Sequence, residues 1–107
     1  MRAPQVEPDP TLPGRVRIHE VGVRDGLQNE SAVVPVEVKA EFVRRLAASG
    51  LETIEVTSFV NPQWVPQLAD AADLLAALGA EGLGRHRPVL VPNERGLDRA
   101  LEAGVSA

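Results

Sequence analysis

The 107-residue chain contains no cysteine, and this absence excludes disulfide bonds, thiolate metal ligands and a cysteine nucleophile. It has no apolar run near the roughly 20 residues that a membrane-spanning helix needs, so we expect no membrane partner. Its formal net charge of −4 leaves no basic surface for a nucleic acid. The composition, 44% hydrophobic and 24% charged, is typical of a soluble globular domain or of part of one.

Residues 1–14 hold four of the nine prolines but no apolar stretch like that of a secretory signal. They are also not the basic, acid-poor stretch that targets proteins to organelles. We therefore predict a poorly ordered leader at 1–14, followed by one domain at 15–107. Ten arginines against one lysine, with abundant alanine and glycine, suggest a bacterial source, and we expect a cytoplasmic location.

From residue 15 onward, strand-like and helix-like segments alternate. Runs rich in β-branched residues or bounded by proline predict strands at 16–21, 52–58 and 88–91. Spaced apolar residues with terminal signals predict helices at 36–49, 67–78 and 94–103. Short links between these segments predict parallel βα units.

Local signals support the predicted helices. In the first one, Val38, Phe42 and Leu46 recur at the spacing of one helical face, which predicts the buried stripe. Gly50 follows that helix at the position where a left-handed residue commonly ends one. Asn93 precedes the third helix and is a plausible N-cap.

Two α/β architectures fit this alternation: an open doubly wound sheet and part of a (β/α)8 barrel. The open sheet lacks support, because no glycine-rich phosphate fingerprint follows the first strand. A complete barrel needs about 250 residues, whereas this chain has three βα units and the start of a fourth. In either case one flank of a parallel sheet would be unpaired, so we expect the chain to be a fragment.

Polar residues gather where the predicted strands end, which is where both architectures place their functional sites. After the first strand come Arg24, Asp25, Gln28, Asn29 and Glu30; the second ends in Glu55, Thr57, Ser58 and Asn61; and Asn93 follows the third.

Glu55 is the most informative of these residues. It alternates with Ile54 and Val56, so it lies on the face of the strand opposite to theirs. A carboxylate held inside a fold is costly unless a cation meets it, and Arg24, which follows the neighbouring strand, is the expected partner. A structural ion pair that ties two strands together explains the same pattern, as a simple turn explains Asp25.

Other residues give weaker signals. The sequence has no His-x-His pair, phosphate-binding loop or Ser-His-Asp set. His19 lies within the first predicted strand, where a structural role is expected. Trp64 lies between prolines and is interpreted as a packing residue.

Three stretches resemble a known family: "VRIHEVGVRDGLQNE", "LETIEVTSFVNPQWVPQLAD" and "PVLVPNERGLDRALEAG". They are similar to the N-terminal part of the 3-hydroxy-3-methylglutaryl-CoA lyases, and the resemblance runs from about Val16 to the C-terminus. "RDG" alone fits a wider set of metal-dependent lyases and acyl-CoA condensing enzymes, including isopropylmalate and homocitrate synthases. "RDGLQNE" and "SFVNPQWVPQ" are much more specific to the lyases.

The resemblance implies an α/β fold made of the N-terminal three βα units of a (β/α)8 TIM barrel, truncated before strand 4. It also implies a reaction, the retro-aldol cleavage of 3-hydroxy-3-methylglutaryl-CoA to acetyl-CoA and acetoacetate in leucine degradation and ketone-body metabolism. The implied partners are an acyl-CoA substrate and, for the full-length form, further copies of the chain in a homo-oligomer.

Roles for five residues follow from the same resemblance. Asp25 would be a ligand of Mg²⁺ or Mn²⁺, and Arg24 the catalytic arginine that binds substrate and stabilises the enolate oxygen. Gln28 would lie beside metal and substrate, Glu55 would orient Arg24 or the substrate, and Ser58 would line the same rim.

The chain also departs from the family pattern. Val23 stands where the family usually has proline, which predicts a small change in loop rigidity. The family's His-x-His pair, its asparagine ligand and its reactive cysteine loop are absent, so we expect this chain alone to be inactive. Two alternatives remain: a family member acting on another acyl-CoA or 2-oxo acid, and a non-catalytic domain whose open sheet edge pairs with a partner.

Overall fold

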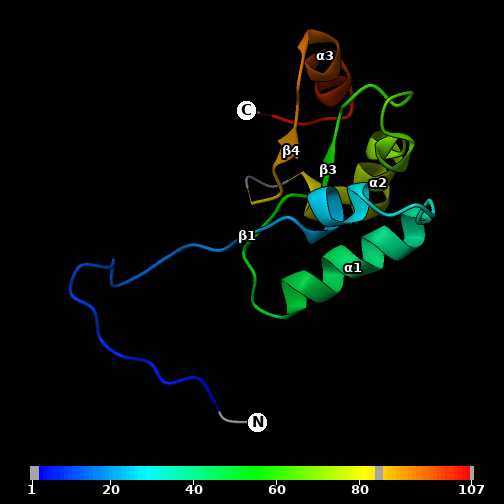
Figure 1. The fold of residues 1–107 in the computed structure, drawn as a ribbon. Coiled ribbons are helices and arrows are strands. Elements are labelled where there is room, and N and C mark those ends of the chain that lie inside the picture. Colours follow the sequence, from blue (N-terminus) through cyan, green and yellow to red (C-terminus); the bar gives the residue numbers. More distant parts are fainter. Residues whose placement is uncertain (1–2, 84–85, 107) are drawn as a thin grey trace.

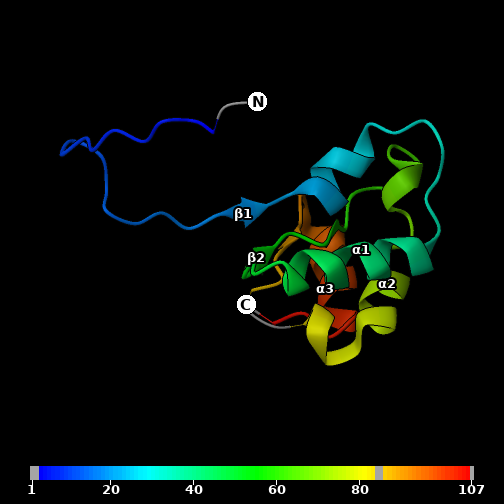
Figure 2. The same ribbon diagram turned by 90° about the horizontal axis from the view of Figure 1, so that it is seen from below.

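The computed structural model describes residues 3–83 and 86–106 and has an α/β fold. Its strands are β1 (His19–Glu20), β2 (Thr53–Ile54), β3 (Thr57–Ser58) and β4 (Val89–Leu90). Its α-helices are α1 (Val36–Ala48), α2 (Ala71–Leu78) and α3 (Glu94–Glu102). Three further turns are helical: η1 (Gly22–Gly26), η2 (Pro66–Leu68) and η3 (Gly79–Gly82). Residues 3–18 are exposed and extend away from the body (Figures 1 and 2).

The strands are parallel, and the segment 53–58 runs between the other two. β1 pairs with β2 in the register His19↔Thr53, and β3 pairs with β4 in the register Thr57↔Val89. The N–H of Glu55 donates to Glu20 O (2.8 Å), on the side of β1. The carboxyl ends of three chain segments thus meet at one edge, as parallel βα units require.

A β-bulge interrupts the segment that the sequence predicted as one continuous strand at 52–58. Val56 N donates to Pro88 O (3.1 Å) and Phe59 N donates to Leu90 O (2.9 Å), so three residues on one strand span two on the other. Such an extra residue breaks the alternation of faces. Phe59 therefore joins Val56 in the buried core. The predicted strand is divided into two short ones, β2 paired with β1 and β3 paired with β4.

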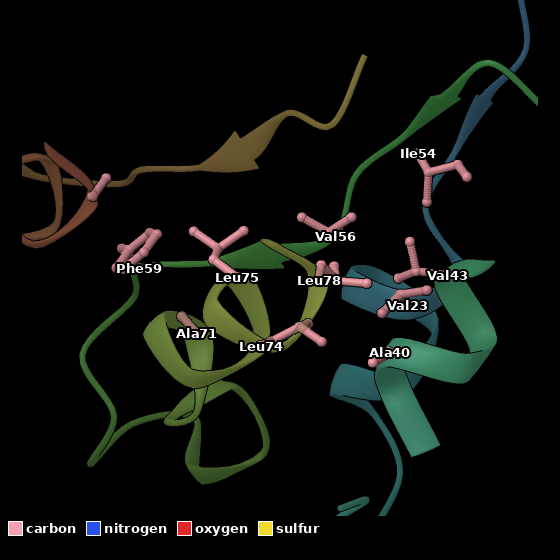
Figure 3. Close-up of a cluster of buried hydrophobic side chains, with 11 residues drawn as sticks. Val23, Ala40, Val43, Ile54, Val56, Phe59, Ala71, Leu74, Leu75 and Leu78 are labelled. Carbon is pink, nitrogen blue, oxygen red and sulfur yellow. The ribbon is translucent and has the colours of Figure 1, made fainter. Parts of the chain in front are cut away.

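The core lies where α1 and α2 pack against each other, with α1 also contacting β2 and α2 contacting β3. Figure 3 shows the side chains that meet there. The buried hydrophobic cluster consists of Val23, Ala40, Val43, Ile54, Val56, Phe59, Ala71, Leu74, Leu75, Leu78 and Ala100.

The buried stripe of α1 differs from the predicted one. Val38 is 55% exposed, whereas Lys39, Ala40 and Val43 are buried. Phe42 and Leu46 of the predicted stripe are half-buried and pack against the core, so the prediction is wrong only for Val38. The fully buried positions include Lys39, whose ammonium finds buried partners. Apolar spacing could not foresee a lysine on the core side.

Other boundaries differ for local reasons. The first strand, predicted at 16–21, is limited to His19–Glu20, because residues 16–18 are exposed and the chain enters η1 directly afterwards. The helix predicted at 67–78 is divided into η2 and α2, with Asp70 between them in a non-helical conformation.

The remaining helices follow the prediction closely. α1 and α3 end one residue before the predicted 49 and 103, and β4 covers the middle of the predicted 88–91. Asn93 caps α3, its side-chain oxygen accepting from Gly96 N (2.8 Å), and Gly50 after α1 has φ 101°. Both predicted end signals are therefore confirmed. No helix in the described part of the chain is long and apolar enough to cross a membrane.

Candidate functional site

The turn after β1 carries the arginine–aspartate pair. Where a simple turn was one explanation of Asp25, the chain forms η1, a π-helical turn in which Asp25 N (2.8 Å) and Gly26 N (3.1 Å) both donate to Val21 O. Val23 points into the core beside Val43 of α1 (Figure 3). Packing of Val23 therefore fixes the turn, and the polar residues next to it lie at the strand ends.

Arg24 and Glu55 form an ion pair between adjacent chain segments. The Nε of Arg24 donates to Glu55 Oε2, and the two side chains are only 18% and 13% exposed. Glu55 is held in place because its main-chain N–H bonds to β1. The contact predicted between these two residues is thus confirmed.

Two further groups extend this ion pair. His19 Nε2 lies 3.3 Å from Glu55 Oε1, so both oxygens of that carboxylate have a nitrogen partner. Arg24 Nη1 lies 3.4 Å from Asp25 Oδ1. The result is a line of alternating charge from Asp25 through Arg24 and Glu55 to His19, the last carrying charge only when protonated.

This arrangement makes Arg24 suited to binding an anionic oxygen. A guanidinium offers five N–H donors, of which Glu55 and Asp25 engage those on Nε and Nη1. In the part of the chain that the structure describes, Nη2 has no hydrogen bond. A planar cation held from one side in a half-buried place can direct its other edge at a carboxylate, enolate or carbonyl oxygen.

Gln28 and Ser58 are near this line of charges but do not bond to it. Gln28 is half-buried and lines a groove of about 280 Å³ together with Trp64 and residues near both. Ser58 is buried on β3, which lies against η1, and its hydroxyl has no hydrogen-bond partner among the described residues. The structure thus brings together Arg24, Asp25 and Glu55, and leaves Gln28 and Ser58 outside the ion-pair network.

The described residues do not form a metal centre. Within 3–83 and 86–106, no three residues of the types His, Cys, Asp and Glu gather closely enough to hold an ion. The Asp25 side chain is mostly exposed and shares its surroundings with the Arg24 cation. It can supply one oxygen ligand, which is fewer than a hard divalent cation requires.

The structure also corrects and extends the sequence analysis. Trp64 is 76% exposed, so the interpretation as a packing residue was wrong. The contact of His19 with Glu55 was missed, although the parallel register that places His19 opposite Thr53 brings it near. The buried contacts of Lys39 with Gln67 and Asp70 were missed too. Their only sequence signal is that Lys39 stands four residues before Val43, on the same helical face.

Comparison with known proteins gives one consistent result. The family model HMGL-like matches residues 15–107. The mitochondrial hydroxymethylglutaryl-CoA lyase of Arabidopsis thaliana is 53% identical over 93 residues, which cover 87% of this chain and 20% of that protein. The cytoplasmic 3-hydroxy-3-methylglutaryl-CoA lyase of Rattus norvegicus is 50% identical, covering 89% and 27%.

Solved structures agree with these sequence matches. The crystal structure of hydroxymethylglutaryl-CoA lyase from Pseudomonas aeruginosa has a TM-score of 0.76 and 45% identity, covering 88% of this chain and 31% of that one. An HMG-CoA lyase from Acinetobacter baumannii, solved with coenzyme A and 3-methylmalate, has a TM-score of 0.73 and 33% identity. The chain spans about a fifth to a third of the length of these relatives. Because the family model matches residues 15–107, the chain belongs to the HMGL-like family.

Proposed function

We propose that this chain supplies one part of a 3-hydroxy-3-methylglutaryl-CoA lyase active site. The observation that carries the proposal is the half-buried Arg24–Glu55 ion pair at the ends of parallel strands, next to Asp25 in the motif RDGLQNE. The family and its lyase relatives support the same reaction. Because the chain spans about a fifth to a third of those relatives, the activity of a whole enzyme is a proposal.

The proposed reaction is a carbon–carbon cleavage. A base removes the proton of the tertiary hydroxyl, whose oxygen becomes the new carbonyl oxygen of acetoacetate. The bond between the hydroxyl-bearing carbon and the CH2 next to the thioester breaks, and its electrons form the enolate of acetyl-CoA. Protonation of that enolate completes the products. The negative charge moves toward the thioester oxygen, so a fixed cation near that oxygen lowers the barrier.

Arg24 is the proposed cation. Its Nε is held by Glu55, and the rigid guanidinium can present further N–H groups to the substrate without reorganising. Glu55 is the positioning partner, and His19 on its other oxygen adds a second constraint. Gln28 and Ser58 are proposed rim residues, one in the groove beside the turn and one with a buried hydroxyl that has no recorded partner in the described chain.

Asp25 is proposed as one oxygen ligand of a divalent cation, Mg²⁺ or Mn²⁺. Its exposed carboxylate at the strand ends supports this role. The described residues supply no complete coordination sphere, so no step of the reaction is derived through the metal.

Further proposals concern the whole enzyme. Parallel βα units and the likeness to solved lyases support a (β/α)8 barrel. The relative solved with coenzyme A supports an acyl-CoA substrate. A homo-oligomer and a cytoplasmic location stay predictions, since the named relatives include mitochondrial and cytoplasmic forms.

A chimera tests the proposed function. Residues 15–107 replace the matched segment of the Pseudomonas aeruginosa lyase, and cleavage of 3-hydroxy-3-methylglutaryl-CoA is measured with added Mg²⁺ or Mn²⁺. We expect activity that a chelator removes and that Asp25→Ala abolishes. A folded chimera without activity, or full activity in Asp25→Ala, contradicts the proposal. Parallel assays with other acyl-CoA thioesters and 2-oxo acids decide the substrate class.

A further inference from the structure

The most buried charged residue lies outside the candidate site and has no part in the proposed reaction. Lys39 of α1 is 1% exposed. Its ammonium donates to the main-chain oxygen of Gln67 and to both carboxylate oxygens of Asp70, each at 2.9 Å. An ammonium has three donors, and all three are used, which is what allows the charge to be buried.

Gln67 connects this lysine to the loop that follows the RDGLQNE motif. The Gln67 side chain is buried, and its oxygen accepts from Val34 N (2.8 Å). Its amide nitrogen donates to Ala32 O (2.7 Å) and Glu30 O (3.3 Å). The side-chain amide of Gln67 therefore forms hydrogen bonds with three main-chain groups of one loop. That loop has no helix or strand between residues 30 and 35.

The loop and the segment around Gln67 form the two walls of one groove. Residues 28–31 and Val33 line one side, and residues 64–67 line the other, enclosing about 280 Å³. Gln28, a proposed rim residue, and the exposed Trp64 both belong to it. The hydrogen bonds of the Gln67 side chain join the two walls.

We propose that Lys39 is a positioning residue: with Asp70 it fixes the backbone of Gln67, and the Gln67 side chain in turn fixes the loop 30–34 and the shape of the groove beside Gln28. These four hydrogen-bonded elements, Lys39, Asp70, Gln67 and the loop 30–34, are called the brace. The brace itself rests on the contacts above. Its bearing on a lyase site rests on the proposed function.

The test uses amide hydrogen exchange of the whole 107-residue chain, which requires no enzyme activity. Gln67→Met removes the three side-chain hydrogen bonds and leaves the Lys39–Asp70 pair. We expect exchange at Val34 to accelerate about tenfold or more, while Ile54 and Val56 in the central strand segment change less than twofold. Fluorescence of Trp64, the single tryptophan, should shift as the groove opens.

Asp70→Asn tests the positioning role of Lys39 without removing the lysine itself. It weakens the contact that holds the ammonium, and we expect a smaller but selective acceleration at Val34. Arg45→Met is the matched control, because Arg45 is on the same helix, exposed and paired only with Glu41 among the described residues. It should leave Val34 unchanged.

Two results would overturn the proposal. The first is exchange at Val34 in Gln67→Met that rises no more than at Ile54 and Val56, since that is global destabilisation. The second is an Asp70→Asn chain whose Val34 exchange equals that of the Arg45→Met control. Loss of lyase activity in the chimera would refute the proposed function and leave these exchange results unaffected.

Discussion

Arg24, on the turn after β1, donates from Nε to Oε2 of Glu55, on the chain segment that runs beside β1. The pair joins the two elements that carry the most specific motifs of the chain, and both side chains are largely withdrawn from water. Burial makes each charge dependent on the other, because an unpaired charge in such a place is costly. Substitution of either residue should therefore affect the other one.

The first prediction separates a reacting cation from a structural ion pair. In the chimera, we expect Arg24→Gln to reduce kcat by about 10²–10³, the loss typical of one group that stabilises charge in the transition state. Glu55→Gln keeps the shape and one acceptor and should cost less, about tenfold. The measurement is steady-state kinetics with matched unfolding curves. Equal losses of stability in both variants with unchanged kcat would favour the purely structural pair.

The second prediction concerns the stability of the brace. Lys39→Met should reduce the free energy of unfolding by about 3 kcal/mol, because it leaves the Asp70 carboxylate without its buried partner. In the double variant Lys39→Met/Asp70→Leu, the loss should be smaller than the sum of the two single losses. Urea unfolding measures all three. For comparison, breaking the exposed Arg45–Glu41 pair should cost no more than about 0.5 kcal/mol. Additive losses in the double variant would argue against a direct Lys39–Asp70 coupling.

Much of the fold could be predicted because it depends on local chemistry. The capping side chain of Asn93 and the positive φ at Gly50 are properties of single residues and their neighbours. The Arg24–Glu55 contact followed from a parallel order of segments and from the cost of an unpaired carboxylate. The first two inferences are local, whereas the Arg24–Glu55 contact joins residues 31 apart and could be inferred only from the expected order of the strands.

The remaining features depend on contacts between residues far apart in the sequence. The bulge at the end of the central segment is visible only in its pairing with residues 88–90. The buried ammonium of Lys39 is paired with Asp70, 31 residues later in the sequence. Ligands of a metal could not be assigned beyond Asp25, since no three residues of the types His, Cys, Asp and Glu in the described part of the chain gather closely enough to hold an ion. The hydrophobic periodicity and the secondary-structure propensities of a sequence carry no information on these long-range partners.

The third prediction concerns the pKa of the Asp9 carboxyl group. Asp9, in the leader, accepts from the hydroxyl of Thr11 (2.6 Å) and from its main-chain N–H (2.9 Å), and these bonds lower the pKa of Asp9 below its ordinary value. Stability of this turn is therefore present above the ordinary pKa and is lost as pH falls through the lowered one. An NMR titration of the Asp9 side chain measures it, and Thr11→Ala should return the pKa toward its ordinary value. A normal pKa in the unsubstituted chain would mean that the turn at residues 9–12 does not persist.

The fourth prediction concerns the glycine at which α3 approaches the central segment. A Cβ on Gly96 would lie 2.4 Å from the main-chain oxygen of Phe59, which cannot move without breaking the core around that residue. In an unobstructed helix, replacing glycine by alanine stabilises by about 1 kcal/mol. We expect Gly96→Ala to destabilise instead, because α3 must shift away from the strand ends. That shift would also change the pocket between α3 and residues 59–63.

Thermal and urea unfolding of Gly96→Ala measure this sign directly. Gly14→Ala is the control, because a Cβ there meets nothing within 4 Å and the residue is exposed in the leader. Its unfolding curve should match that of the unsubstituted chain. If Gly96→Ala proves more stable than the parent chain, α3 does not pack as closely on Phe59 as the structure has it. A lower free energy of unfolding in Gly96→Ala would show that close packing requires glycine at this position, because helix propensity alone predicts a higher one.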